Sequence, residues 1–160
     1  MSTLFHTMLT ALPLSLALPL AAAAVVTSSD DKATAAILEQ IQRYERALNA
    51  SDIDQVMVLY GEAPVFMPQH APALVGRDAV RAGYRQVFDT IKLKIRFDVH
   101  EIQAVGDWAW ARTSSAGRTR ILANGADIEE GNNELFVFRR ENGVWKIHRY
   151  LFSTNQPPRA

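Results

Sequence analysis

The sequence contains no cysteine, and this absence excludes disulfide bonds, thiol catalysis and thiolate metal ligands. It also lacks an excess of either charge, because 17 basic residues balance 17 acidic ones. Charge therefore gives no reason to expect nucleic acid or an anionic membrane as a partner. The histidines at 6, 70, 100 and 148 show no metal-ligand spacing, and the sequence has no phosphate-binding glycine loop or nucleophile elbow. We expect no cofactor and no metal.

The beginning of the chain lacks charge over a long stretch. Residues 7–26 are almost all apolar, carry no charged side chain and pass through four alanines at 21–24, a set of small residues suited to signal cleavage. Pro13 and Pro19 make this run a poor permanent membrane helix, although no lysine or arginine precedes it. We predict a cleaved export signal over residues 1–24 and a periplasmic or secreted protein. The alternatives are a membrane anchor or a mis-assigned start, and the latter would make the protein cytoplasmic.

Residues 25–160 are predicted to form a single domain. A chain of 160 residues with 48% apolar and 21% charged side chains has the composition of an ordinary globular protein and is long enough for a sizeable core. It shows no internal repeat and no low-complexity linker that would mark a second unit.

The last third of the chain carries the strongest secondary-structure signal. It predicts long antiparallel strands over residues 107–121, 127–139 and 144–155, with Asn124-Gly125 and Asn142-Gly143 at the turns. Asn-Gly is typical of a type I′ hairpin turn, whose two central residues need positive φ. Because β-branched and aromatic side chains are dense between the turns, we expect one face of this sheet to be buried.

Helices precede this sheet. Ile37, Ile41, Tyr44 and Leu48 form one apolar stripe on a predicted helix over residues 31–50, and shorter helices are predicted over 52–60 and 77–91. A short strand is expected over residues 63–67, and residues 92–102 alternate between apolar and polar side chains as a half-buried strand does. Helices followed by a mainly antiparallel sheet indicate an α+β fold, with the helices covering one face of the sheet.

Four stretches of the chain resemble one family pattern. They are residues 43–52 (RYERALNASD), 63–68 (APVFMP), 75–81 (VGRDAVR) and 143–149 (GVWKIHR). Here the chain is similar to the SnoaL-like and ketosteroid isomerase-like bacterial proteins of the nuclear transport factor 2-like superfamily. The resemblance implies a cone-shaped, strongly curved antiparallel sheet wrapped around a long N-terminal helix, also called a cystatin-like fold, with a pocket inside. Members are usually homodimers and include isomerases, dehydratases, cyclases, hydrolases and inert binding modules.

Comparison with the isomerase reaction singles out Tyr44 and Met67. A ketosteroid isomerase uses an aspartate as general base and an oxyanion hole made of a tyrosine and a protonated aspartate. In the matching segment its acid stands just before a proline, and Met67 takes that place here. The resemblance puts Tyr44 at the position of the oxyanion tyrosine. The alternative for Tyr44 is a core residue whose hydroxyl bonds to the backbone.

Glu134 and His148 are the other candidate catalytic residues. Glu134 shares a strand face with Phe136, and an apolar setting would raise the pKa of its carboxyl to suit general acid or base catalysis. It lies near the second acid of the isomerase, although Leu135 competes for that position, and a solvent-exposed strand end is the alternative. His148 shares the face of Phe152 and is predicted to exchange a proton with Glu134; a hydrogen-bonded core or interface histidine is the alternative.

The pocket implied by the resemblance has a largely apolar wall. Its predicted ligand-binding residues are Tyr60, Phe66, Met67, Tyr84, Phe136, Tyr150 and Phe152. Two functions stay open. One is an enzyme that acts on a small apolar carbonyl or polyketide-like compound by general acid–base chemistry, and the other is a module that binds a small ligand without chemistry. The missing base favours the second, whereas burial of Tyr44, Glu134 and His148 favours the first, because each needs a partner out of water.

Trp108 and Trp110 alternate with Ala109 and Ala111, which gives that strand one bulky face and one small face. Either the tryptophans line the pocket, or the alanines face inward and the tryptophans form an outer surface. The resemblance favours the second arrangement. We therefore expect a homodimer that forms through the outer face of the sheet.

Overall fold

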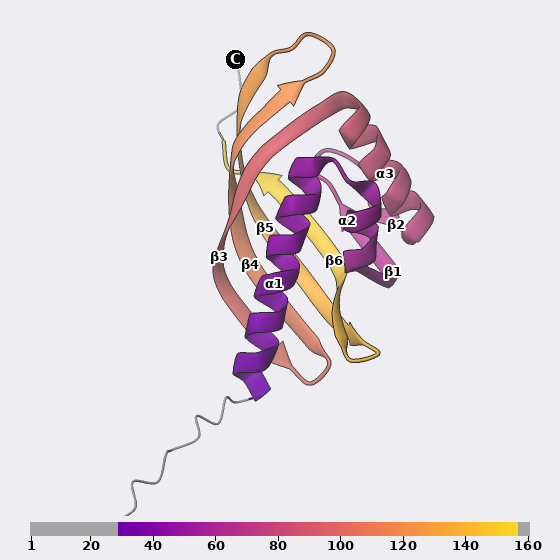
Figure 1. The fold of residues 1–160 in the computed structure, drawn as a ribbon, viewed down its shortest axis with the longest axis vertical. Helices are drawn as coiled ribbons and strands as arrows, with labels where there is room; N and C mark the ends of the chain where they lie inside the picture. Colours follow the sequence, from indigo (N-terminus) through magenta and orange to yellow (C-terminus); the bar gives the residue numbers. More distant parts are fainter. Residues whose placement is uncertain (1–28, 157–160) are drawn as a thin grey trace, which may run out of the picture.

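The computed structural model describes residues 29–156, which form helices packed against one curved sheet (Figure 1). The elements in chain order are α1 (Ser29–Ala50), α2 (Ile53–Leu59), β1 (Tyr60–Met67), β2 (Leu74–Val75), α3 (Arg77–Thr90), β3 (Ile91–Val105), β4 (Trp108–Ile121), β5 (Asp127–Glu141) and β6 (Val144–Thr154). The strands make a six-stranded sheet in the order β2-β1-β6-β5-β4-β3. The predicted α+β fold is confirmed, with the concave face of the sheet curving around α1 (Figure 1).

The pairing of β1 with its long neighbour β6 differs from the pairing of the other long strands. Strands β3 to β6 form an antiparallel meander, whereas β1 pairs with β6 in parallel. A hairpin forces its two strands to be antiparallel, but β1 and β6 are far apart in the chain and no hairpin joins them. β1 also begins at Tyr60 rather than at residue 63, and the two-residue strand β2 is too short for its pattern to predict it.

The helices follow their sequence signals closely. The predicted stripe of α1 is confirmed, because all four of its members are buried: Ile37, Ile41, Tyr44 and Leu48. Asp52 caps α2, where its side chain accepts the N–H of Gln55 at 2.9 Å. This helix ends one residue earlier than predicted, since Tyr60 already has extended backbone with φ −79° and ψ 144°.

The two predicted Asn-Gly turns have different structures. Asn142 and Gly143 have φ of 50° and 80°, so the predicted pair of positive φ angles is confirmed between β5 and β6. In the loop between β4 and β5, Gly125 has φ of 70° but Asn124 does not take positive φ. The Asn124 side chain instead accepts the N–H of Ala126 at 3.0 Å. The type I′ prediction is therefore wrong for that loop, which spans residues 122–126 and is held by an asparagine side chain.

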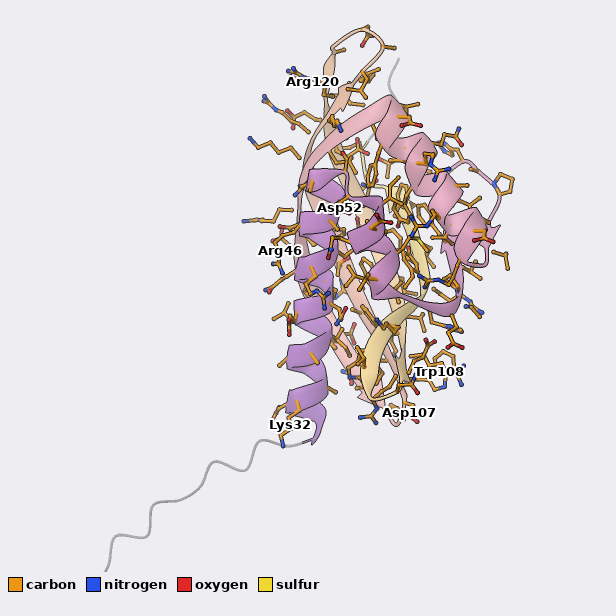
Figure 2. All side chains as sticks on the ribbon, turned by 45° about the vertical axis from the view of Figure 1, so that its right-hand side comes forward. Lys32, Arg46, Asp52, Asp107, Trp108 and Arg120 are labelled. Carbon is orange, nitrogen blue, oxygen red and sulfur yellow. The ribbon has the colours of Figure 1, made fainter. Side chains whose placement is uncertain are left out.

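The two tryptophans of β4 lie on the outer face of the sheet. Trp108 and Trp110 expose 46% and 38% of their surface, whereas Ala109 and Ala111 are buried on the inner face. Trp108 projects on the side of the sheet away from α1 (Figure 2). The arrangement with inward alanines is therefore confirmed.

The predicted export signal over residues 1–24 lies outside the described residues and stays a prediction. Among residues 29–156, no helix combines the length and the apolar character needed to cross a membrane.

Phe136 offers a direct test of the core. It is fully buried on β5, with its ring stacked on that of Tyr150 at a centroid distance of 4.4 Å. Truncation leaves a cavity among packed rings, so we expect Phe136→Ala to lower the free energy of unfolding by about 3–5 kcal/mol. Urea denaturation measures this change, with Leu122→Ala in the exposed β4–β5 loop as the control, expected within about 0.5 kcal/mol of wild type. A loss below about 1 kcal/mol for Phe136→Ala would contradict the packing described.

Candidate functional site

A cavity of about 130 Å³ lies between the concave face of the sheet and the helices α1 and α3. Its wall consists of Tyr44, Leu48, Phe66, Pro68, Tyr84, Val87, Ile91, Leu93, Ile95, Glu130, Asn132, Glu134, Tyr150 and Phe152. Side chains fill the remaining space between helices and sheet (Figure 2). The polar atoms of the wall come from tyrosine hydroxyls and from β5, so the cavity combines a hydrocarbon interior with a few fixed polar groups.

Glu134 is a buried carboxyl in the wall of the cavity. It occupies an inward position of β5 with 5% of its surface exposed. Its cross-strand neighbour on β4 is Thr113, whose hydroxyl donates to Oε2 of the carboxyl at 2.6 Å. Burial raises the pKa of Glu134 from 4.5 to about 7, and hydrogen bonds from Ser115, Thr113 and Tyr150 oppose this rise. The carboxyl therefore changes its protonation state near neutral pH.

Three tyrosine hydroxyls meet beside the cavity. The hydroxyl of Tyr84 on α3 bonds to the hydroxyl of Tyr44 on α1 and, at 2.9 Å, to that of Tyr60 at the start of β1. Burial is the largest of the causes that raise the pKa of all three phenols well above the usual value. They stay protonated at neutral pH and act as hydrogen-bond donors. The alternative given for Tyr44 is correct in placing its ring in the core, but its hydroxyl bonds to another side chain instead of to the backbone.

The predicted site residues divide into two groups. The structure brings six of them to the cavity wall: Tyr44, Phe66, Tyr84, Glu134, Tyr150 and Phe152. It leaves four outside that wall: Tyr60, Met67, Phe136 and His148. Tyr60 lies behind Tyr84 and Phe136 lies behind Tyr150, so both support wall residues instead of contacting a ligand. Met67 follows the inward Phe66 on β1, and strand alternation turns it to the other face.

His148 does not share the face of Tyr150, and that prediction is wrong. Ile147 pairs with Phe138 and Arg149 pairs with Val137, so the register shifts and His148 is an extra residue in β6. Such a bulge reverses the side-chain alternation that the sequence pattern assumed. The His148 ring instead packs edge-on against Trp108, with centroids 5.0 Å apart, on the outer side of the sheet.

His148 is buried, but it does not line the cavity. The side chain is 8% exposed, and burial lowers the pKa of its imidazole, with Arg149 and Arg139 acting in the same direction. Its Nδ1 atom has no hydrogen-bond partner within the described part of the chain. Proton transfer between His148 and Glu134 therefore has no structural support.

Polar residues of the inner face were missed by sequence reasoning. Thr113 holds the Glu134 carboxyl, and Asn132 donates from Nδ2 to Oγ of Ser115 at 3.3 Å. Once Ala111 is known to face inward, period-two alternation places residues 113 and 115 on the same face. This alternation was present in the sequence, but threonine and serine in a strand do not indicate a functional site unless a buried partner is known.

The wall of the cavity has no positive charge. Among the described residues that line it, none is lysine, arginine or histidine, and its ionisable carboxyls are Glu130 and Glu134. Across residues 29–156, no three His, Cys, Asp or Glu side chains are grouped so that they could hold a metal ion. The chemistry that this wall supports is proton transfer at a carboxyl and hydrogen bonding from phenols.

A similar fold occurs in known proteins. A ketosteroid isomerase-like protein from Erwinia carotovora atroseptica SCRI1043 is 31% identical and aligns over 77% of this chain and 96% of its own, with a TM-score of 0.74. A proposed dehydratase of the NTF2-like family from Streptomyces avermitilis is 18% identical over 79% and 99% of the two chains, with a TM-score of 0.69. An uncharacterised protein with a cystatin-like fold from Caulobacter vibrioides is 16% identical over 79% and 92%, with a TM-score of 0.66. The last two similarities show the fold alone.

The sequence itself establishes the family. The SnoaL-like domain model matches residues 41–149, which is more than half of the chain. The protein therefore belongs to the SnoaL-like family. No curated protein matches the sequence significantly.

The raised pKa of Glu134 predicts a pH-dependent loss of stability. The folded-state pKa of about 7 exceeds the ordinary value of 4.5. The stability that the Glu134 carboxyl contributes to the folded state is therefore fully present below pH 4.5 and is lost as pH rises to about 7. Glutamine cannot ionise, so we expect the free energy of unfolding of Glu134→Gln to rise relative to that of the wild type as pH increases. The difference between the two proteins should change by roughly 3 kcal/mol from pH 4 to pH 8. Urea denaturation across this range measures the difference. Glu39→Gln, on the exposed side of α1, is the control, and a pH-independent difference for Glu134→Gln would contradict the raised pKa.

Proposed function

We propose that this protein is an enzyme of the isomerase or dehydratase type that acts on a small, apolar carbonyl compound by general acid–base chemistry. One observation carries the proposal: a single apolar cavity is lined by a buried carboxyl that titrates near pH 7 and by a tyrosine whose hydroxyl belongs to a buried network. A catalytic acid or base works best when its pKa lies near the operating pH. The similar protein from Erwinia, described as ketosteroid isomerase-like, supports a reaction of this class.

The base in this proposal is Glu134. It replaces the carboxyl that an isomerase carries before the proline, where this chain has Met67. The ionised Glu134 removes a proton from the carbon next to the substrate carbonyl, and the protonated carboxyl returns that proton to the same or another carbon. For an isomerase, return to a different carbon moves the double bond, and no atom is gained or lost. Thr113 holds Oε2 of this carboxyl in place, and Ser115 and Tyr150 also hydrogen-bond the carboxyl.

Tyr44 stabilises the charge that develops on the carbonyl oxygen. The hydroxyl of Tyr84 bonds to those of Tyr44 and Tyr60. If Tyr60 donates to Tyr84 and Tyr84 donates to Tyr44, these two bonds do not use the proton of Tyr44, which lines the cavity and can turn towards a ligand. Donors fixed before the reaction stabilise a developing oxyanion without reorganisation. Tyr84 and Tyr60 are positioning residues in this scheme.

A non-catalytic binding module is the second candidate. Two observations favour it: Met67 stands where the isomerase has its base, and most of the cavity wall is apolar or aromatic. In that case the tyrosines and Glu134 satisfy one another's polar atoms and only shape the pocket. Turnover distinguishes the two candidates, because a binding module takes up a ketone without exchanging its protons.

Exchange of the α-protons of cyclohexanone with D₂O, followed by proton NMR, tests the chemistry without knowledge of the natural substrate. We expect the wild-type protein to accelerate exchange, with a rate that rises as pH increases through about 7 and Glu134 ionises. Glu134→Gln and Tyr44→Phe should each lower this rate at least about tenfold, whereas Glu39→Gln on exposed α1 should leave it unchanged. A rate that Glu134→Gln does not alter would make Glu134 a spectator and favour the binding module.

We also propose that two chains associate through the outer face of the sheet. Trp108, Trp110 and Val105 are exposed there and border an apolar hollow with Leu135 and Val137. Contiguous apolar surface of this kind is typical of an interface between protein chains.

Light scattering at micromolar concentration is expected to give the mass of a dimer. Trp110→Arg places a charge in the centre of the apolar hollow and should give the mass of a monomer. Leu122→Arg, in the loop between β4 and β5, is the matched control and should remain dimeric. A monomeric wild-type protein at this concentration would remove the proposal.

A further inference from the structure

The size of the cavity limits what it can hold. Its volume is about 130 Å³, and a buried apolar cavity of about 150 Å³ is known to take up benzene. Phe66 closes one side, with its ring stacked between those of Tyr84 and Tyr150 at centroid distances of 5.1 and 5.4 Å. All three rings are buried, so this wall is packed on both sides and cannot move outward without opening the core. The space therefore fits one six-membered ring.

The polar groups of the wall follow one edge. Glu130, Asn132 and Glu134 occupy alternate positions of β5 and all line the cavity. At about 3.3 Å per residue, Glu130 lies about 13 Å along the strand from Glu134, so carboxyls stand at both ends of this edge. The opposite walls are hydrocarbon, from Leu48 and Val87 among others. A ligand with one polar group near Glu134 and an otherwise apolar body matches this arrangement.

The charge of the wall selects against anions. Lysine, arginine and histidine do not occur among the described residues that line the cavity, and arginines such as Arg46 and Arg120 project outward (Figure 2). An anionic ligand would enter a site of low dielectric constant with carboxyls at both ends and no counter-charge. Glu130, which is partly exposed, is the first of the two carboxyls that such a ligand would approach from solvent.

We infer that the cavity takes a neutral ketone of single-ring size, with its carbonyl at Tyr44 and Glu134, and that Glu130 excludes carboxylated analogues of the same size. This inference rests on the proposed function, which supplies the carbonyl group, and it narrows the substrate class. The fixed stack of Phe66, Tyr84 and Tyr150 prevents this wall from moving outward, so polycyclic ketones and large polyketide-like compounds fit the space less well than a single ring. Glu130 is thereby a specificity-determining residue that takes no part in proton transfer.

Binding of five probes to the full-length protein tests the inference. The probes are cyclohexanone, cyclohexanecarboxylate, cyclohexylammonium, the two-ring ketone decalone and a four-ring steroid ketone, each titrated with amide chemical shifts as the readout. We expect the Kd of cyclohexanone to be at least about tenfold lower than those of the carboxylate and of the two larger ketones. Equal or tighter binding of the carboxylate or of the steroid ketone overturns the inference, as does tighter binding of the ammonium ion or no binding of any probe.

Two substitutions separate the charge and the size arguments. Glu130→Gln removes one repelling carboxyl, so the affinity for cyclohexanecarboxylate should rise at least about threefold while that for cyclohexanone stays within about twofold. Val87→Ala enlarges the cavity from α3 and should improve the affinity for decalone at least about tenfold, with Leu93→Ala as a second enlarging variant if the first fails to fold. Val58→Ala, exposed on α2, is the control. The inference is overturned if Glu130→Gln does not change the preference for cyclohexanone over cyclohexanecarboxylate and the enlarged cavity does not change the preference over decalone.

The α-proton exchange reaction distinguishes failure of this inference from failure of the proposed enzyme. If cyclohexanone binds with the expected preference but its α-protons do not exchange, the binding inference stands and the acid–base enzyme is wrong. If the steroid ketone exchanges its protons and cyclohexanone does not, the chemistry stands and the single-ring limit is wrong.

Discussion

Tyr44 connects the long helix α1 to α3, to β1 and to the concave face of the sheet. Its ring packs edge-on against those of Phe136 and Tyr150, with centroid distances of 5.6 and 5.3 Å, and thereby seats α1 on the concave face of the sheet. Its hydroxyl bonds to Tyr84 on α3, which in turn bonds to Tyr60 at the start of β1. Because one side chain fixes α1, α3, β1 and the sheet together, the geometry of the cavity depends on the same contacts that hold the fold.

Burial of polar groups in this interior is a compromise between stability and function. A hydroxyl or carboxyl removed from water is destabilising unless it finds hydrogen-bond partners. The tyrosines satisfy one another, and Thr113 satisfies one oxygen of Glu134, yet burial still raises the pKa of that carboxyl to about 7. The ionised form is therefore kept at some cost to the folded state. A protein without use for a titrating group at this position would be more stable with an apolar side chain there.

Much of the fold was predictable because its signals are local. The stripe on α1, the alternation along β3 and the turn at Asn142-Gly143 each depend on neighbouring residues, and each was confirmed. The errors concern features that depend on distant residues or on one extra residue. The bulge at His148 leaves no trace in the period-two pattern, and the parallel pairing of β1 with β6 depends on no turn. For the site, the wall positions of Tyr44, Glu134 and four of the six predicted aromatic residues were predictable, but the contact between three hydroxyls from three elements was not.

The size of the cavity follows from how the sheet divides its concave face. Near the start of β4 and the end of β5, Ala109 pairs with Phe138 and Ala111 pairs with Phe136. Small residues on one strand thus leave room for large rings on the next. Towards the other end, the same register pairs Thr113 with Glu134 and Ser115 with Asn132. Aromatic rings fill the half of the concave face around Phe136 and Phe138. In the half around Thr113 and Asn132, short polar side chains leave space against α1 and α3. One strand register therefore sets both the filled core and the empty site, and a register slip would destroy both together.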